Sequence, residues 1–271
     1  MLKVAVTGCA GRMGKEIARI VIAADGMELV GGTEYKGHES IGKDLLAYIG
    51  EGHETSGGGP KIAADLKEIV KETDVVIDFT LPESSIEHFN VAADSGKAIV
   101  IGTTGFSKEQ VEKIHQRKNE VRCVVAPNMS VGVNAAFKLA AEAVKILGRG
   151  YDIEIVEMHH RLKKDAPSGT AAKLAEICAE GTKRDLAKVG VYGRHGMVGE
   201  RKPDEIGIMT LRGGDVVGEH TVIFAGEGER LEITHRCTSR KNFAMGAVRA
   251  AAWVVEKQNG IYDMQDVLGL R

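Results

Sequence analysis

Short apolar runs alternate with longer amphipathic runs through the first half of the chain. The apolar runs are uninterrupted and rich in β-branched residues, as expected for strands covered on both faces of a parallel sheet. They predict strands over residues 2–8, 28–34, 74–80, 98–103 and 122–126. The amphipathic runs predict helices over residues 12–24, 64–72, 82–95 and 107–119, the last opened by a capping box, and a polar loop over 50–60. This βαβ alternation predicts an α/β domain with a parallel sheet.

The pattern changes after Pro127 and Asn128. An amphipathic run predicts a helix over residues 133–147, and a strand over 152–159 and a helix from about Ser168 follow it. Three strand-like stretches then follow without intervening helices, at 206–211, 216–225 and 230–237. Strands in direct succession favour antiparallel pairing, so this half predicts a separate α+β domain. A helix over 242–257 is predicted near the end of the chain.

Length and charge agree with this division. A chain of 271 residues favours two domains. The formal net charge of −2 gives no bulk attraction to nucleic acid or to an anionic membrane. The four cysteines are scattered without a Cys-x-x-Cys pair, and the chain has neither a signal-peptide pattern nor a membrane-length apolar run. We therefore expect a cytoplasmic protein with free thiols that binds neither nucleic acid nor membrane.

Three glycines follow the first predicted strand at a spacing of three residues. Gly8, Gly11 and Gly14 stand where a strand turns into a helix, and this context suits the pyrophosphate of a dinucleotide. The structural alternative is a turn that only lets the helix pack closely on the strand. Glu34 favours the dinucleotide, because it stands twenty residues beyond Gly14 at the end of the second strand, where a carboxylate accepts hydrogen bonds from ribose hydroxyls.

The same carboxylate bears on cofactor choice. Glu34 disfavours a 2′-phosphate, so we predict a preference for NADH, with tolerance of NADPH through Lys36 or Arg12. Two further turns, at residues 102–105 and 126–129, follow the fourth and fifth strands at the sheet edge that binds ligands. As alternatives, both are ordinary Gly/Thr and Pro/Asn turns.

A cationic cluster follows the strand over residues 152–159. His159, His160 and Lys163 supply an imidazole that titrates near neutral pH and an ammonium, both able to deliver a proton beside a hydride. Their positive charge also attracts a carboxylate. A single histidine here would more often be packed or exposed than catalytic. A metal site is not predicted, because adjacent strand residues diverge and the lysines oppose a cation.

A predicted helix start lies directly after this cluster. Ser168 is expected to cap the helix, so that the amides of Gly169 and Thr170 face an anion. An ordinary cap is the alternative. We interpret Arg161, Lys164 and Asp165 as a solvated loop, and His195, His220 and His235 as isolated structural residues. The dinucleotide loop and the cationic cluster together indicate a reductase for an acidic substrate.

At these residues the sequence resembles the dihydrodipicolinate reductase family, over essentially its whole length. The resemblance is carried by residues 6–14, 78–80, 100–106, 130–134, 159–170 and 218–221. It implies a Rossmann domain over residues 1–129, a substrate-binding and tetramerisation domain with an open mixed sheet over 130–239, and a segment over 240–271 that returns to the first domain. It also implies a homotetramer that reduces a cyclic hydroxy-imine dicarboxylate with NAD(P)H and loss of water, in lysine and diaminopimelate biosynthesis.

Roles carry over to matching residues. The resemblance implies that His159 and Lys163 are the acid–base pair, with Lys163 the stronger candidate for proton donor, and that His160, Gly169 and Thr170 hold the substrate. The implied cofactor contacts are Gly8, Cys9, Ala10, Gly11, Arg12, Met13, Glu34, Gly102, Thr103, Thr104, Ala126, Pro127, Asn128 and Met129. The sequence departs from the family pattern at Tyr35, where some members have an arginine suited to a 2′-phosphate, at Met129, where some have an aromatic residue, and at Leu162.

Two alternatives remain open from the sequence. One is a nicotinamide-dependent reductase of another small dicarboxylate. The other is a catalytically silent NAD(P)-binding sensor whose second domain only oligomerises, which would leave Lys163 and the anion site without a purpose. A panel of substrates separates the first alternative, and cofactor binding without turnover would favour the second.

Overall fold

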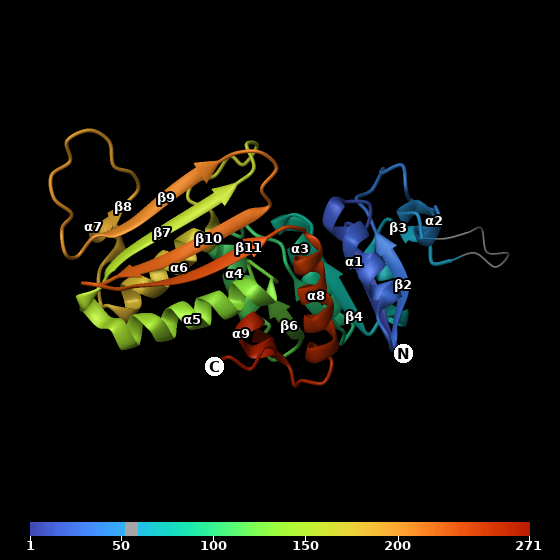
Figure 1. Ribbon diagram of the computed structural model, residues 1–271. Coiled ribbons are helices and arrows are strands. Elements are labelled where there is room, and N and C mark those ends of the chain that lie inside the picture. The colour runs from blue at the N-terminus through green and yellow to red at the C-terminus, as the bar shows by residue number, and fades with distance from the viewer. Residues whose placement is uncertain (52–58) are drawn as a thin grey trace. The chain divides into compact units, whose positions relative to one another are not determined.

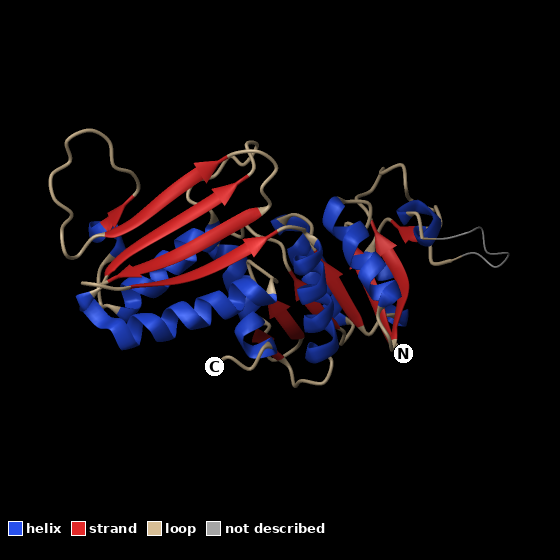
Figure 2. Ribbon diagram, in the orientation of Figure 1, coloured by secondary structure: helices blue, strands red, loops and turns tan. Residues whose placement is uncertain are grey.

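A seven-stranded sheet organises the first of two units. The computed structural model describes residues 1–51 and 59–271, and its contacts divide the chain into unit 1, Met1–Val131 with Arg240–Arg271, and unit 2, Gly132–Ser239. The predicted loop over residues 50–60 falls largely on residues 52–58, which lie outside the described ranges. Figures 1 and 2 show the elements of each unit.

The sheet of unit 1 is parallel throughout, which confirms the Rossmann-type prediction. Its strand order is β12-β6-β5-β4-β1-β2-β3. Five of these strands were predicted, and the two-residue β3 and three-residue β12 are too short for a periodic signal. The strands are β1 (Leu2–Thr7), β2 (Met27–Thr33), β3 (Ile62–Ala63), β4 (Val75–Asp78), β5 (Ala98–Ile101), β6 (Arg122–Val125) and β12 (Gly260–Tyr262).

Helices cover both faces of this sheet (Figure 1). Helices α1 (Arg12–Ala23) and α8 (Lys241–Val254) pack on the face that includes Val75 and Ile77 of β4. Helices α3 (Pro82–Asp94) and α4 (Lys108–Gln116) pack on the opposite face with Val76. Burial of successive β4 residues on opposite faces explains the continuous apolar runs of the sequence. Two short helices, α2 (Leu45–Ile49) and α9 (Met264–Val267), complete unit 1.

The predicted helix over residues 64–72 is wrong. The segment forms two 3₁₀ turns, Leu66–Glu68 and Val70–Glu72, instead of an α-helix. Ile69 separates them with φ −120° and ψ −13°, outside helical geometry. Its side chain packs against Gly31 of β2, and Asp65 caps the first turn. Packing of Ile69 on the sheet therefore overrides the helical pattern.

Unit 2 carries a five-stranded mixed sheet, with the order β11-β10-β7-β9-β8. Strand β10 pairs antiparallel with β7 and β11, whereas β9 pairs in parallel with β7 and β8. The prediction of antiparallel pairing is correct for β10 and β11 and wrong for β9, because β7 lies between β9 and β10. The strands are β7 (Asp152–His159), β8 (Gly190–Val191), β9 (Ile206–Arg212), β10 (Gly218–Ala225) and β11 (Arg230–Cys237).

Two long helices cover one face of the mixed sheet (Figure 1). Helix α5 (Val131–Leu147) and helix α6 (Gly169–Gly181) bury apolar side chains against alternate residues of β7, β9 and β10. The alternating burial along β7 reflects this one-sided cover. A short helix, α7 (Leu186–Val189), precedes β8. Within residues 1–51 and 59–271, no helix combines the length and the apolar character needed to cross a membrane.

Candidate active site

The glycine turn after β1 has the geometry of a phosphate loop. Gly8 has φ +65°, which disfavours a side chain, and a Cβ on Gly14 would overlap the carbonyl oxygen of Gly8. Helix α1 begins after Gly11 without a side-chain cap. Its first amides therefore suit an anion, and the helix dipole favours negative charge at the same place. The turn fits the pyrophosphate of a dinucleotide.

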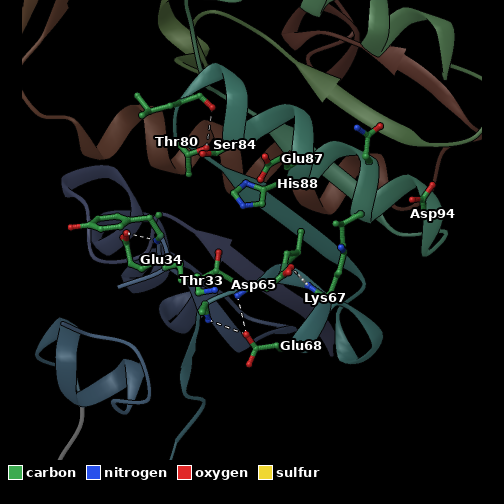
Figure 3. A pocket seen from close by; sticks show the side chains of 18 residues that line it. Thr33, Glu34, Asp65, Lys67, Glu68, Thr80, Ser84, Glu87, His88 and Asp94 are labelled. Carbon is green, nitrogen blue, oxygen red and sulfur yellow. Dashed lines mark hydrogen bonds between the residues drawn. The ribbon is translucent and has the colours of Figure 1, made fainter. Parts of the chain in front are cut away.

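Glu34, directly after β2, lines a cleft of unit 1 (Figure 3). Its Oε1 accepts a hydrogen bond from the amide of Ala10 at 2.8 Å, so the carboxylate is tied to the glycine turn. The cleft has a volume of about 860 Å³, with Gly8, Thr80 and His88 also in its wall. Tyr35 is 70% exposed beside Glu34. A carboxylate at the end of β2 lies beside the glycine turn at the end of β1. This arrangement suits a dinucleotide, with the carboxylate on a ribose and the turn on the pyrophosphate.

A buried carboxylate supports this edge of the sheet. Asp78, the last residue of β4, is fully buried and accepts hydrogen bonds from Thr7 Oγ1 at 2.6 Å and from His88 Nδ1 at 3.0 Å. The hydroxyls of Thr80, Ser85 and Thr103 complete its surroundings. Burial by itself would raise the pKa of Asp78, but the hydrogen bonds, led by that of His88, outweigh it and hold the pKa below its ordinary value. Sequence reasoning did not identify this network.

The turn after β5 points its hydroxyl inward. Thr103 Oγ1 accepts from the amide of Thr80 at 2.9 Å and donates to Asp78 at 3.1 Å. Gly102 lies against the ring of Phe79, so that a Cβ there would overlap the ring. The Thr103 hydroxyl is engaged within the protein, so its side chain is not a supported contact for a nucleotide. In the predicted turn at residues 102–104, the backbone is the part suited to contact a nucleotide.

Side chains are also buried in residues 126–129 and 8–13, the two other segments predicted to contact the cofactor. Ala126 and Met129 belong to the core of unit 1, and Asn128 Oδ1 accepts from the amide of Ser130 at 2.9 Å. Cys9 is fully buried, and burial, with the charge of Glu34, raises the pKa of its thiol to about 12. Its side chain is therefore an apolar packing group, not a nucleophile.

The cationic cluster of unit 2 is built around Glu157 and His159. Because both lie on the core-facing side of β7, Glu157 Oε2 meets His159 Nδ1 at 2.5 Å. Arg212, from the end of β9, donates from both terminal nitrogens to the same carboxylate, at 2.9 and 3.0 Å. Burial would raise the pKa of Glu157, but these donors and the amide of Ser168 outweigh it and lower the pKa. Glu157 is therefore an ionised, fully buried carboxylate.

Lys163 lies in the loop after β7 and faces the same cluster. Its Nζ donates to both oxygens of Asp165 at 2.9 Å. Asp165 is 63% exposed, as expected for a solvated charged loop, and it also pairs with Lys163. Burial lowers the pKa of His159, and the charges of Lys163 and Arg212 add to that effect, while Glu157 opposes it. The structure thus brings the two predicted acid–base residues together.

The predicted anion site lies at the start of α6. Ser168 is the N-cap, and its Oγ accepts from the amide of Ala171 at 3.2 Å, which confirms the predicted cap. Gly169 is exposed. His160 Nδ1 is buried and has no hydrogen-bond partner within the described ranges of the chain. A ring nitrogen in that state is suited to donate to a ligand carboxylate.

His220 was predicted to be isolated, and this is wrong. Its ring lies 5.1 Å from that of His159, between centroids, and its Nε2 lies 2.9 Å from Ser168 Oγ. Burial, reinforced by the charge of His159, lowers the pKa of His220 to about 3. The Gly-Glu-His-Thr segment that contains His220 was a signal in the sequence, but its position beside His159 depends on the register of β10 on β7. His235 of β11 is opposite His220 in the β10–β11 pairing.

The Glu157 carboxylate of this cluster is engaged by hydrogen-bond donors. Glu157 is occupied by Arg212 and His159. Within the described residues, no group of three or more histidines, cysteines, aspartates or glutamates is arranged to hold a metal ion.

Comparisons with known proteins cover the whole chain. Residues 2–129 match the model of the dihydrodipicolinate reductase N-terminus, and residues 132–268 match that of the C-terminus. The 4-hydroxy-tetrahydrodipicolinate reductases of Syntrophobacter fumaroxidans and Syntrophus aciditrophicus are 51% and 52% identical over 271 residues, which is 100% of each chain.

Solved structures agree in fold. The dipicolinate-bound dihydrodipicolinate reductase from Paenisporosarcina sp. TG-14 has a TM-score of 0.76 and 29% identity, with 98% of both chains covered. The scyllo-inositol dehydrogenase of Lactobacillus casei, at a TM-score of 0.60 and 14% identity over 100% of this chain and 93% of its own, shares the fold alone. This chain belongs to the dihydrodipicolinate reductase family.

Proposed function

We propose that the protein reduces 4-hydroxy-tetrahydrodipicolinate to tetrahydrodipicolinate with NAD(P)H and with loss of water, in the diaminopimelate route to lysine. The observation that carries the proposal is the cluster of Lys163, His159 and His160 beside the start of α6. It combines proton donors with an anion site, as a dicarboxylate reductase requires. Identity of about half the residues with 4-hydroxy-tetrahydrodipicolinate reductases over the full length supports it.

In this proposal unit 1 binds the dinucleotide. The pyrophosphate lies against the turn of residues 8–13, and Glu34 accepts hydrogen bonds from the adenosine ribose. The left-handed backbone of Gly8 and the cleft beside Glu34 support this. The backbones of residues 102–104 and 126–129 complete the site. Unit 2 binds the substrate and joins copies of the chain into a homotetramer. The four cysteines are free, in keeping with the cytoplasmic location that we also propose.

The substrate's carboxylates are placed on three groups of unit 2. His160 donates from Nδ1, and Gly169 and Thr170 offer their amides at the start of α6. Charge attraction comes from Lys163, whose side chain is 20% exposed. Two carboxylates on one small ring thus meet donors from a loop and from a helix start.

The dinucleotide, when bound, supplies a hydride to the substrate ring. Lys163 holds the proton that accompanies this reduction, and its contact with Asp165 keeps the ammonium in the cluster. Uptake of that proton balances the reaction, in which substrate, NAD(P)H and one proton give product, NAD(P)⁺ and water. His159 is the second member of the acid–base pair, beside Glu157.

We further propose a preference for NADH. Glu34 lines the proposed cofactor cleft beside the exposed Tyr35, and a carboxylate at the end of β2 repels a 2′-phosphate. The cation of Lys36, which lines the same cleft, provides some tolerance of NADPH. Titration with each nucleotide tests this, and a strong preference for NADPH would overturn it.

The function is tested with the freshly generated condensation product of pyruvate and aspartate semialdehyde. Oxidation of NADH or NADPH is followed at several substrate concentrations. Turnover that saturates with this substrate supports the proposal. Tight NADH binding without turnover would favour the sensor alternative, and turnover only with a different dicarboxylate would favour the other reductase.

A further inference from the structure

We propose that Glu157, held in place by Arg212, is a positioning residue that fixes His159 as its Nδ1–H tautomer and leaves Nε2 as the acceptor atom. The inference rests on the proposed function for the acid–base role of His159. His159 and Lys163 then have separate roles. His159 is the neutral acceptor, and Lys163 is the donor.

The tautomer follows from the chemistry of the Glu157 carboxylate. An ionised carboxylate only accepts hydrogen bonds, so the ring nitrogen that meets it must carry the hydrogen. That nitrogen is Nδ1, at 2.5 Å from Oε2. In the neutral ring the lone pair is then on Nε2. The edge of the ring near Nε2 faces Gly218, where an added Cβ would be 3.0 Å from Nε2, so a side chain at that position would crowd the acceptor atom.

Glu157 has enough donors to remain ionised while fully buried. Besides His159, it accepts two N–H groups of Arg212, the amide of Ser168 at 3.0 Å and the hydroxyl of Thr210 at 3.3 Å. A buried carboxylate with this many donors is stabilised in its charged form. The donors come from β9 and from the start of α6, so two elements besides β7 hold the carboxylate in one orientation.

Burial is the main reason why the Glu157 carboxylate does not make His159 cationic, and the positive charges of Lys163 and Arg212 add to it. A glutamate alone beside an imidazole would favour the imidazolium. Here Arg212 from β9 compensates the charge of Glu157, and Lys163 from the loop adds further positive charge, partly offset by Asp165. From β10, His220 faces the ring without a charge near neutral pH, because burial keeps its pKa at about 3. His159 is therefore neutral near neutral pH, because its pKa lies below the ordinary imidazole value.

The same strand offers a matched control in Glu154. It precedes Glu157 by three residues on β7 and is also held by arginines, with Arg194 at 2.9 Å to each oxygen and Arg201 at 3.0 Å. In the described part of the chain, its side chain is hydrogen-bonded to these arginines and not to the histidine cluster. Glu154→Gln thus removes a carboxylate paired with arginines from β7 and leaves His159 untouched.

The experiment is a long-range proton–nitrogen correlation spectrum of histidine-labelled protein, with the His159 signals assigned from a His159→Gln variant. We expect the Nδ1–H tautomer in the wild type and in Glu154→Gln. In Glu157→Gln we expect a mixture of tautomers, since the amide can donate as well as accept. A wild-type signal from the Nε2–H tautomer would overturn the proposal.

Kinetics supply the second readout. We expect kcat of Glu157→Gln to fall by about 10- to 100-fold, as for other residues that orient a catalytic imidazole, with the Kd for NADH within about twofold of wild type. Glu154→Gln should stay within about twofold in both. Retention of both the tautomer and kcat in Glu157→Gln would refute the positioning role.

Loss of one buried charge can unfold a domain, so a second variant is needed. Glu157→Gln combined with Arg212→Met removes both charges and avoids an unpaired buried cation. It should show the same mixed tautomer and the same fall in kcat. The two proposals fail separately, because the wild-type tautomer is read without turnover. An Nδ1–H tautomer without turnover would reject the proposed function alone, and turnover with an Nε2–H tautomer would reject the positioning role alone.

Discussion

His88 Nδ1 lies 3.0 Å from Asp78 Oδ1, so a side chain of α3 is joined to a fully buried carboxylate at the end of β4. Figure 3 shows the His88 ring at the cleft that Glu34 also lines. The pair thus connects the packing of unit 1 with the wall of its proposed cofactor site.

Asp78→Asn should lower the free energy of unfolding by about 2 kcal/mol, since it weakens several hydrogen bonds to a charged group. The hydrogen bonds hold the folded-state pKa of Asp78 below its ordinary value, although burial opposes them. Its stabilising contribution is therefore present above the ordinary carboxyl pKa and is lost as the pH falls through the folded value. Urea unfolding at pH 7 and in acid should show that variant and wild type differ less in their free energy of unfolding in acid.

The control for this prediction is Asp74→Asn. Asp74 precedes β4, is exposed, and accepts from the amide of Lys3 at 2.9 Å. Its loss should change the free energy of unfolding by less than about 0.5 kcal/mol. Equal effects of the two substitutions would show that the buried hydrogen bonds of Asp78 add nothing to the free energy of unfolding.

Gly14→Ala should abolish measurable dinucleotide binding and destabilise unit 1. The added methyl group would overlap the carbonyl oxygen of Gly8, and the backbone there has to shift. Calorimetric titration with NADH measures the effect. Gly150→Ala is the control, because at that position nothing in the described part of the chain lies within 4 Å of an added Cβ. Unchanged NADH affinity in Gly14→Ala would argue against a tight phosphate loop.

Lys163→Ala should lower kcat by about 10²- to 10⁴-fold while the Kd for NADH stays within about twofold, because the proton donor is lost and unit 1 is untouched. His159→Ala should have a similar but smaller effect. The neighbouring Lys164 is exposed, and Lys164→Ala should retain kcat within about twofold. Parallel loss of cofactor affinity and kcat in Lys163→Ala would indicate a folding defect in place of a lost donor.

His220 should make unit 2 less stable in mild acid. Burial lowers its folded-state pKa to about 3, so below the ordinary value of 6.5 the unfolded chain binds a proton that the folded chain does not. The contribution of His220 to the free energy of unfolding is then fully present above pH 6.5 and is lost as the pH falls toward 3. Between pH 7 and pH 5 the loss is about 2 kcal/mol. Urea unfolding of wild type and His220→Gln at both pH values checks this, and an equal pH dependence of the two proteins would contradict it.

Local patterns were sufficient for the parts of this protein that depend on neighbours in the chain. Continuous apolar runs predicted the parallel sheet because both of its faces are covered. The spacing of Gly8, Gly11 and Gly14 predicted a tight turn, and Ser168 predicted a helix start. These features follow from backbone geometry over a few residues, and so they can be read without the fold.

The surroundings of His159 were decided by the tertiary structure. Arg212 is opposite His159 in the parallel β7–β9 register, and His220 is opposite Glu157 in the antiparallel β7–β10 register. These partners lie more than fifty residues away in sequence. Tertiary structure also decides the contact of Thr103 with Asp78, 25 residues earlier in the sequence, because β4 and β5 pair. Local periodicity determines which face of a strand a residue occupies, but only strand order and register, set by the packing of the whole sheet, determine which charge it meets.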